Sequence, residues 1–344
     1  MKAHLNVKKE YHNGICIDWF EFTLFEHNYF DVICILGLDY DGIEFIDGYG
    51  QNGYNYSIHF NNITILFGNR DDMGVHVRMT GDGCRNFEKY SKIGFDNLIK
   101  VIFALSKFNQ AKMSRIDIAY DDFEGLIDID ACVSDVREGN VVSRFRKGSI
   151  IESFNFNNEK KTFKTLNCGR QGSNIWITIY DKLAERRSKD IVPDCDYWVR
   201  CEIKMRHNNA DRFIQLLNEG KPMIELYFLV LNNYIRFVVP SDSDTNKWRW
   251  AVAPHWDRFC NSVIDGEKIS LYVAPSDDYN EYKLVNYVTK QAGAAVYTYI
   301  QKFGISDLMN QVDGKKYMLA LKYRELLSDP DEAVLSDIGG DNIE

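Results

Sequence analysis

The sequence has no apolar run long enough to cross a membrane as a helix. Its most apolar stretch, residues 223–239, is interrupted by Glu225, Asn232 and Arg236, whereas a spanning helix needs about 20 mostly apolar residues. The beginning of the chain lacks the apolar block of a secretory signal. Six prolines are enough to mark turns but too few for proline-rich linkers. These absences favour a folded protein that does not enter a membrane.

Three metal or nucleotide motifs are also missing. The eight cysteines contain no Cys-x-x-Cys pair, which excludes a zinc ribbon and a dithiol redox pair. The seven histidines contain no His-x-His pair, so a metal site would have to be built from carboxylates. No Gly-x-x-x-x-Gly-Lys-[Ser/Thr] loop is present, so the chain does not encode its own helicase. The scattered thiols predict a reducing, cytoplasmic location.

Charge is distributed unevenly along the chain. The net charge is −9, but residues 325–344 hold seven acids and no Lys or Arg, whereas residues 140–212 hold 15 Lys or Arg against 9 Asp or Glu. A phosphate-binding surface depends on the local potential rather than on the total charge. The basic middle segment therefore allows nucleic acid as a partner, although the same counts also fit an ordinary solvated surface.

Apolar and polar residues alternate with a period of two through the first two-thirds of the chain, which is typical of strands. Helical periodicity lies between these segments and dominates the last third. We expect strands over 15–25, 56–67, 75–80, 114–120, 174–180 and 198–205, and helices over 86–109, 181–189, 208–218 and 280–303. The predicted class is α+β, with two similar halves that have antiparallel sheets and packed helices, followed by a mainly helical C-terminal region.

The two halves are predicted from a strand–helix–strand pattern that occurs twice. The second strand of each copy carries Arg-x-acid, first as Arg115 and Asp117 and then as Arg200 and Glu202. Residues two apart in a strand point to the same face, so each copy presents a cation and a carboxylate on one side. If the halves pair about a pseudo-twofold axis, Asp117 and Glu202 converge; chance alternation is the alternative.

The densest polar group lies where the strand that ends at Tyr180 meets the next helix, which carries Lys182 and Glu185. A tyrosine that attacks phosphorus must lose its proton, although its ordinary pKa is about 10, and it needs positive charge around the phosphate. Carboxylates at Asp117 and Glu202 suit a hard cation such as Mg²⁺ or Mn²⁺. Taken singly, a tyrosine is more often a core or rim aromatic, and Arg-x-Asp is more often a surface ion pair.

The order of these segments resembles the Rep_trans family, which comprises replication initiators of rolling-circle plasmids and phages and the related relaxases of integrative conjugative elements. The resemblance rests on GVHVRMTGDG at 74–83, SRIDIAYDD at 114–122, GRQGSNIWITIYDK at 169–182 and VRCEIKMR at 199–206. The first strand, at 14–24, and a late segment, at 282–304, are similar too. Each motif alone is weak evidence for the family, and the order of all four is more specific.

The resemblance implies an enzyme that nicks and rejoins DNA at a rolling-circle origin through a 5′-phosphotyrosyl intermediate. The tyrosine of the family's [IV]-Y-[DN]-K-x-x-E motif falls on Tyr180. The implied cofactor is Mg²⁺ or Mn²⁺, and the implied partners are origin DNA with a single-stranded or extruded nick site, a host DNA helicase and a second copy of the chain. On this basis we assign catalysis to Tyr180, Arg115, Lys182 and Arg200, metal binding to Asp117, Glu202 and Glu185, and DNA contacts to Arg170, Ser173, Lys164, Arg186 and Arg206.

The expected domains are a duplicated α+β nicking core over 1–240, a helical region over 241–325 for origin recognition or dimerisation, and an acidic disordered tail over 326–344. Three tryptophans, Trp248, Trp250 and Trp256, favour a packed core in the middle region over a base-stacking surface. Two other functions remain open. One is a sequence-specific DNA-binding protein without cleavage, and the other is an unrelated α+β protein that binds carbohydrate or peptide.

Overall fold

The structure is a computed structural model that describes residues 12–68, 70–155, 158–189, 191, 193–260, 284–285 and 287–313. The chain forms two compact units, residues 1–273 and 274–344. The acidic tail expected at 326–344 lies outside the described residues, as do residues 280–283 of the last expected helix.

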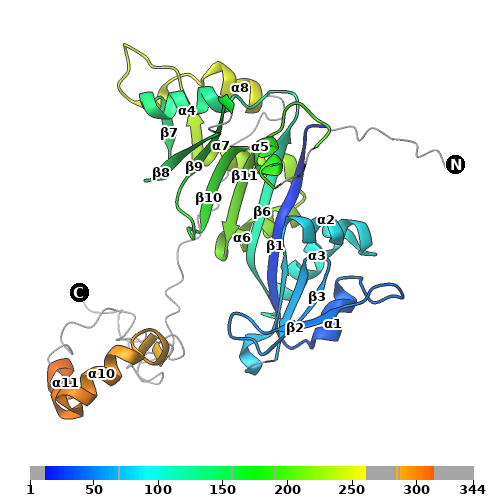
Figure 1. Ribbon diagram of the computed structural model, residues 1–344, viewed down its shortest axis with the longest axis vertical. Helices are drawn as coiled ribbons and strands as arrows, with labels where there is room; N and C mark the ends of the chain where they lie inside the picture. The colour runs from blue at the N-terminus through cyan, green and yellow to red at the C-terminus, as the bar shows by residue number, and fades with distance from the viewer. Residues whose placement is uncertain are drawn as a thin grey trace, which may run out of the picture. The chain divides into compact units, whose positions relative to one another are not determined.

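The first unit is built on a ten-stranded sheet with the strand order β2-β3-β4-β5-β1-β6-β11-β10-β9-β8, and all its pairings are antiparallel (Figure 1). A two-stranded sheet, β12-β7, lies apart from it. The strands are β1 (Gly14–Leu24), β2 (Ile46–Tyr49), β3 (Tyr56–Phe60), β4 (Ile63–Phe67), β5 (Val75–Met79), β6 (Ala111–Asp122), β7 (Val141–Ser143), β8 (Gly148–Asn155), β9 (Asn158–Cys168), β10 (Ile175–Asp181), β11 (Val199–Arg206) and β12 (Ile235–Phe237).

Helices pack on one face of this sheet because alternate strand residues are apolar. On β6, for example, Ile116, Ile118 and Tyr120 are buried, and Tyr120 contacts the rings of Phe228 and Phe259. The helical elements of the first unit are α1 (Tyr29–Ile35), η1 (Asp71–Met73), α2 (Gly81–Tyr90), α3 (Gly94–Ser106), α4 (Ile129–Glu138), α5 (Lys182–Arg187), α6 (Asn208–Asn218), α7 (Met223–Tyr234), η2 (Lys247–Arg249) and α8 (Pro254–Cys260). The α+β class with antiparallel pairing is thus confirmed.

Two expected elements are each divided in the structure. The single strand expected over 56–67 is a hairpin, because Asn61 and Asn62 both adopt positive φ and form a two-residue turn. The helix expected over 86–109 is two helices, α2 and α3. The break comes at Ser91, whose hydroxyl accepts hydrogen bonds from the backbone N–H groups of Ile93 and Gly94. Both breaks come from local polar residues, whose effect hydrophobic periodicity alone does not predict.

The two halves share one continuous sheet, and their topologies differ. β6 and β11 are neighbours at the centre of that sheet. β10 and β11 pair directly, whereas β1 is inserted between β5 and β6. The β8–β9 hairpin, absent from the expected strands, forms one edge. The central pairing of β6 with β11 is nevertheless the one that the repeated motif required.

Residues 252–260 belong to the core of the first unit rather than to a separate region after residue 240. Trp256 is 1% exposed and packs against Phe237 and Phe259, as a core role predicts. Trp248 is 51% exposed. All eight cysteines are free thiols, and five of them are buried, in keeping with packing roles.

In the second unit the structure describes the π-helical segment η3 (Tyr287–Gln291) and the helices α10 (Gly293–Phe303) and α11 (Ile305–Asp313). Their helical character agrees with the expectation for this region. Across the described residues, no helix has the length and hydropathy that a membrane crossing requires.

Candidate active site

The face of the sheet opposite α7 and α8 carries the charged motifs. Cross-strand register sets Asp117 beside Lys204, and Asp121 beside Arg200. Glu202 lies two residues from Lys204 on the same face, so it is a diagonal neighbour of Asp117. Asp117 and Glu202 therefore lie on one face of two adjacent strands, as the repeated motif predicted.

Asp117 is buried and held by an arginine of its own strand. Its side chain is 1% exposed, and Arg115 donates to both carboxylate oxygens, with an Nη2–Oδ2 distance of 2.5 Å. The ring of Trp19 stacks against this guanidinium at 4.0 Å. Burial raises the pKa of Asp117 to about 7, against the lowering effect of Arg115, and the nearby charge of Glu202 raises it further.

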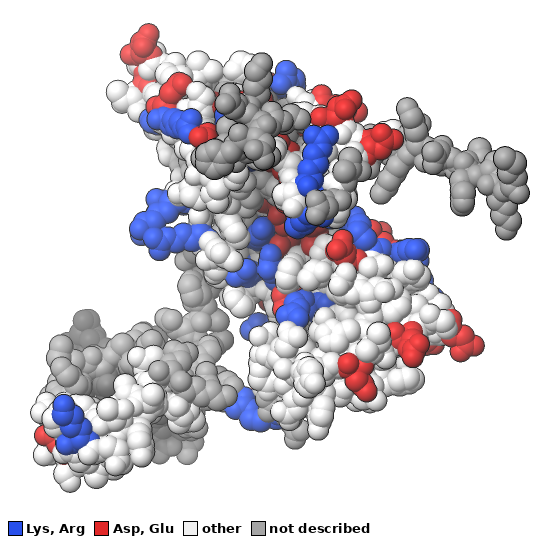
Figure 2. All heavy atoms as spheres, in the orientation of Figure 1, with Lys and Arg blue, Asp and Glu red and all other residues white. Residues whose placement is uncertain are grey.

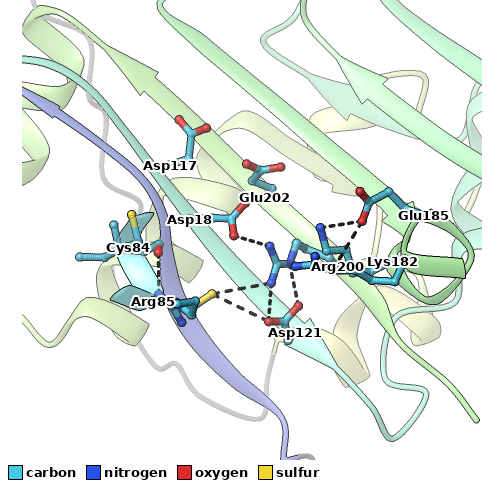
Figure 3. Close-up of polar contacts among 12 residues, drawn as sticks. Asp18, Cys84, Arg85, Asp117, Asp121, Lys182, Glu185, Arg200 and Glu202 are labelled. Atoms are coloured by element: carbon cyan, nitrogen blue, oxygen red, sulfur yellow. Dashed lines mark hydrogen bonds and ion pairs between the residues drawn. The ribbon is translucent and has the colours of Figure 1, made fainter. Parts of the chain in front are cut away.

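Arg200 makes a different set of contacts. Its side chain is 5% exposed and lies between Asp18 (2.5 Å) and Asp121 (2.7 Å). Trp198 donates an indole hydrogen bond to Asp121 at 2.6 Å. Figure 3 shows this cluster beside Glu202 and Asp117. Arg200 is thus neutralised by two carboxylates, Asp121 on the adjacent strand β6 and Asp18 on β1, so little of its charge is free for a substrate.

Asp18 and Asp121 were missed by the sequence reasoning. Asp121 lies four residues after Asp117 in the same strand, so period two alone would have placed it on the same face. Asp18 carried no such signal, because a register shift in β1 between Ile17 and Trp19 changes the alternation there. The irregularity lets Asp18 reach Arg200.

Tyr180 is half-buried near the end of β10 and lines an open pocket of about 640 Å³. Glu202, Lys204 and Arg170 line the same pocket. Across the strands, Tyr180 is paired with Arg200 on β11. Burial raises the pKa of Tyr180, the negative charge of Glu202 adds to the rise, and Arg200 opposes it. Among the described residues, the Tyr180 hydroxyl has no hydrogen-bond partner, which leaves it available to a bound molecule.

Lys182 and Glu185 form an ion pair at the start of α5. Lys182 is buried, its Nζ lies 2.8 Å from Glu185 Oε2 and 5.4 Å from the centre of the Tyr180 ring. Lys189 also contacts Glu185. Burial and the charge of Arg200 lower the pKa of Lys182. Lys182 therefore lies beside Tyr180 as expected, whereas the Glu185 carboxylate is occupied by lysines.

The residues expected to contact DNA divide into two groups. Arg170 is exposed and lines the Tyr180 pocket, and Ser173 closes the same turn through its backbone N–H to Arg170. Lys164, in contrast, pairs with Asp130 at 2.5 Å. Arg186 lies near the Trp198 ring, and Arg206 faces Arg115 across the strands.

Basic and acidic side chains are mixed in a band across the middle of the face shown in Figure 2. This mixture distinguishes the site from a uniformly basic phosphate surface. Phosphate binding here depends on the local balance of these charges.

Asp117 and Glu202 fit a hard divalent cation in donor type. Both are buried carboxylates, and each also contacts a cation of the chain, Arg115 at 2.5 Å or Lys204 at 3.3 Å. Within the described part of the chain, no three His, Cys, Asp or Glu side chains gather as a metal cluster. Mg²⁺ commonly takes only one or two carboxylates, with substrate phosphate and water completing its shell. A two-carboxylate site that is completed by a substrate is therefore compatible with these residues.

Comparison with known proteins identifies the family of the chain. Residues 111–312 match the Rep_trans family, described as replication initiation factor, and residues 14–102 match the N-terminal domain of rolling circle replication initiation proteins. The solved structure of a rolling circle replication initiator protein from Geobacillus stearothermophilus is similar, with 30% identity and a TM-score of 0.65. That similarity covers 73% of this chain and 96% of the other.

A protein from Bacillus subtilis (strain 168) named "Putative DNA relaxase NicK" is 27% identical over 237 residues, which are 67% of this chain and 65% of that protein. The chain thus spans just under two-thirds of this relative. The two family matches together extend over both halves of the sheet and include every residue of the central charged face. The chain belongs to the replication initiation factor family of rolling-circle initiators.

Proposed function

We propose that the protein nicks one DNA strand at a replication origin and rejoins it, with Tyr180 as the nucleophile. The observation that carries this proposal is the position of Tyr180. Its side chain lines an open pocket together with Glu202, Lys204 and Arg170. A phosphodiester in that pocket would meet a nucleophile, a proton acceptor and two cations.

The covalent step can be written on these residues. The Tyr180 Oη forms a bond to phosphorus, the bond from phosphorus to the 3′ oxygen breaks, and the 3′ oxygen takes a proton from water. The product is a 5′-phosphotyrosyl link and a free 3′-OH, and attack by that hydroxyl reverses the step. The phenolic proton goes to Glu202, the carboxylate that faces the same pocket.

Positive charge has to offset the burial that raises the pKa of Tyr180. Lys182 lies beside its ring, and Lys204 and Arg170 line the pocket, so these cations can hold the phosphate in line. We assign Arg200 a positioning role, because Asp18 and Asp121 already neutralise it. We likewise infer that Glu185 positions Lys182 rather than binding a metal.

Mg²⁺ or Mn²⁺, when bound by Asp117 and Glu202, would neutralise charge on the phosphate. The residues of the chain supply the remaining functions: Tyr180 attacks, Lys182 and Lys204 attract the phosphate, and Arg115 holds Asp117 in place.

Two partners follow from this function. The sequence has no phosphate-binding helicase loop, so strand separation needs a separate helicase; purified protein alone should nick but not unwind. A second copy of the chain is the other expected partner. Light scattering of the purified protein would measure its molar mass and so show whether it forms a dimer.

The test is a nicking assay on supercoiled plasmid that carries the source element, with Mn²⁺ or Mg²⁺, followed by denaturing electrophoresis. We expect a DNA-linked protein band that is absent with Tyr180→Phe and with a chelator. Tyr197→Phe is the matched control, because its hydroxyl bonds to the Ile127 carbonyl in the core, away from the pocket. A nick without a linked band would indicate that an activated water, rather than Tyr180, is the nucleophile. Binding without a nick would favour a DNA-binding protein that does not cleave, and no binding would favour an unrelated α+β binding protein.

A further inference from the structure

A tryptophan lies in the Tyr180 pocket, on the same strand and the same face as Tyr180. Along β10, the buried core residues are Ile175, Ile177 and Ile179. Trp176 alternates with them, lines the pocket together with Tyr180, and lies about 13 Å from it along the strand. The volume of the pocket, about 640 Å³, is within the roughly 300–1,000 Å³ of small-molecule sites. The pocket is therefore long enough to hold a phosphate at one end and a base at the other.

The Trp176 ring is bordered by a cation on one side and by glycine backbone on the other. Lys204, directly across on β11, places its Nζ 4.4 Å from the centre of the ring. On the β9 side, Ile177 pairs with Cys168. The next residue, Gly169, is therefore level with Trp176, has no side chain and lines the same pocket. An aromatic ring beside a cation, with one side open, suits the stacking of an unpaired base.

A second tryptophan on this face, Trp19, offers a comparison. Cross-strand register places the two tryptophans at the ends of one row, Trp19–Asp117–Lys204–Trp176. The Trp19 indole N–H donates to Glu21 at 2.9 Å. The Trp176 indole N–H is also buried, but it has no hydrogen-bond partner among the described residues. A buried donor without an acceptor lowers stability, so packing alone does not explain the indole of Trp176.

The pocket around Trp176 is basic. Lys147 and Arg170 are exposed and line it together with Lys204. Of the described residues that line the pocket, Glu202 alone is acidic. Cations beside an aromatic ring suit a single strand, because the cations contact its phosphates while the ring contacts a base. This end of the pocket therefore fits a nucleotide rather than a phosphate alone.

We propose that Trp176 stacks on one unpaired base of the strand that is cleaved, on the side of the ring next to Gly169. The inference rests on the proposed function and adds a strand-positioning contact to it. A base held at Trp176 fixes the register of the strand, and register decides which phosphodiester reaches the Tyr180 hydroxyl. Because every base has a π face, this contact positions the strand without reading its sequence.

The test uses the full chain with Tyr180→Phe, so that bound DNA is not cut. The probe is the single strand around the nick site mapped in the plasmid assay, with one nucleotide at a time replaced by an abasic residue. At one position near the nick, we expect the abasic strand to bind about tenfold more weakly, since stacking of one base contributes an effect of that order.

Removing the ring should remove this dependence. We expect added Trp176→Leu to weaken binding of the intact strand about tenfold, with no further loss for the strand that is abasic at that position. Trp176→Phe, which keeps a smaller ring, should give an intermediate Kd. Trp248→Leu is the matched control, because Trp248 is 51% exposed and is not among the residues that line the pocket. It should bind both strands as the Tyr180→Phe protein does.

Trp176→Phe also keeps the comparison available should Trp176→Leu fail to unfold cooperatively on heating. If the abasic strand still binds about tenfold more weakly than the intact strand to Trp176→Leu, the base stacks elsewhere and the inference is overturned. The absence of any abasic effect would overturn it too. In both cases, binding of the intact strand leaves the proposed function standing. If the Tyr180→Phe protein binds no strand at all, the proposed function itself fails, and the contact at Trp176 fails with it.

Discussion

β6 and β11 lie side by side at the centre of the sheet, and each carries an arginine two residues before a carboxylate. On β6, Arg115 binds the acid of its own motif, Asp117. On β11, Arg200 instead binds Asp18 and Asp121, and Glu202 is left with Lys204. The same local pattern thus yields two electrostatic arrangements.

Cross-strand register causes this difference. In the pairing of β6 with β11, Asp121 lies opposite Arg200, and Lys204 lies opposite Asp117. Arg200 therefore has a carboxylate directly across from it, whereas Arg115 faces Arg206 and turns to its own strand. A motif read along one strand gives the side chains that share a face, and the neighbouring strand decides which of them form pairs.

The largest loss of folding stability should come from removing Arg200. Arg200→Met leaves the part-buried Asp18 and Asp121 without their partner, so we expect the free energy of unfolding to fall by about 3–5 kcal/mol. Arg115→Met leaves a single buried carboxylate, Asp117, which can take up a proton because its pKa is already raised to about 7, so about 1.5–3 kcal/mol is expected. Urea denaturation of both variants measures the difference. Equal losses would mean that the two arginines are structurally equivalent.

The carboxylates should matter more for cleavage than for folding. Glu202→Gln removes the proposed proton acceptor and one charge of the metal pair, so we expect the nicking rate to fall by about 10²–10³-fold. Glu185→Gln is the matched control on α5, because its partners are Lys182 and Lys189, and we expect less than about a tenfold loss. Single-turnover nicking at saturating Mn²⁺ separates the two. A larger loss of nicking rate for Glu185→Gln would indicate that Glu185 is a metal ligand.

The pH dependence of stability should identify Asp117. Its pKa is raised from 3.8 to about 7 in the folded chain, so between these values the folded state binds more protons than the unfolded state. The contribution of Asp117 is therefore fully present below about pH 4 and is lost as the pH rises towards 7. We expect Asp117→Asn to show a shallower decline in the free energy of unfolding across this window, measured by urea denaturation. An unchanged slope would show that Asp117 does not titrate there.

The smallest expected effect is on the salt dependence of DNA binding, which should distinguish Arg170 from Lys164. Arg170 is exposed in the Tyr180 pocket, whereas Lys164 is paired with Asp130. Arg170→Met should lower the slope of log Kd against log salt by about one, as expected for the loss of one phosphate contact. Lys164→Met should leave the slope nearly unchanged. The reverse result would place the DNA over the β8–β9 hairpin instead.

Much of the site could be predicted from the sequence, because alternation in a strand fixes which residues share a face. That argument brought Asp117 and Glu202 together on one face. It could not give Asp18, which depends on an irregularity in β1, or the capture of Arg200 by Asp121, which depends on register. The β8–β9 edge and the insertion of β1 between β5 and β6 depend likewise on long-range pairing that local periodicity does not encode.

The most direct test of the central claim is to locate the DNA on the protein. The covalent complex formed with Mn²⁺ would be digested with nuclease and protease, and the nucleotide-bearing peptide sequenced by mass spectrometry. The account predicts a nucleotide linked through its 5′ phosphate to Tyr180, in the peptide that contains Ile179 and Asp181. A nucleotide on any other residue would contradict it.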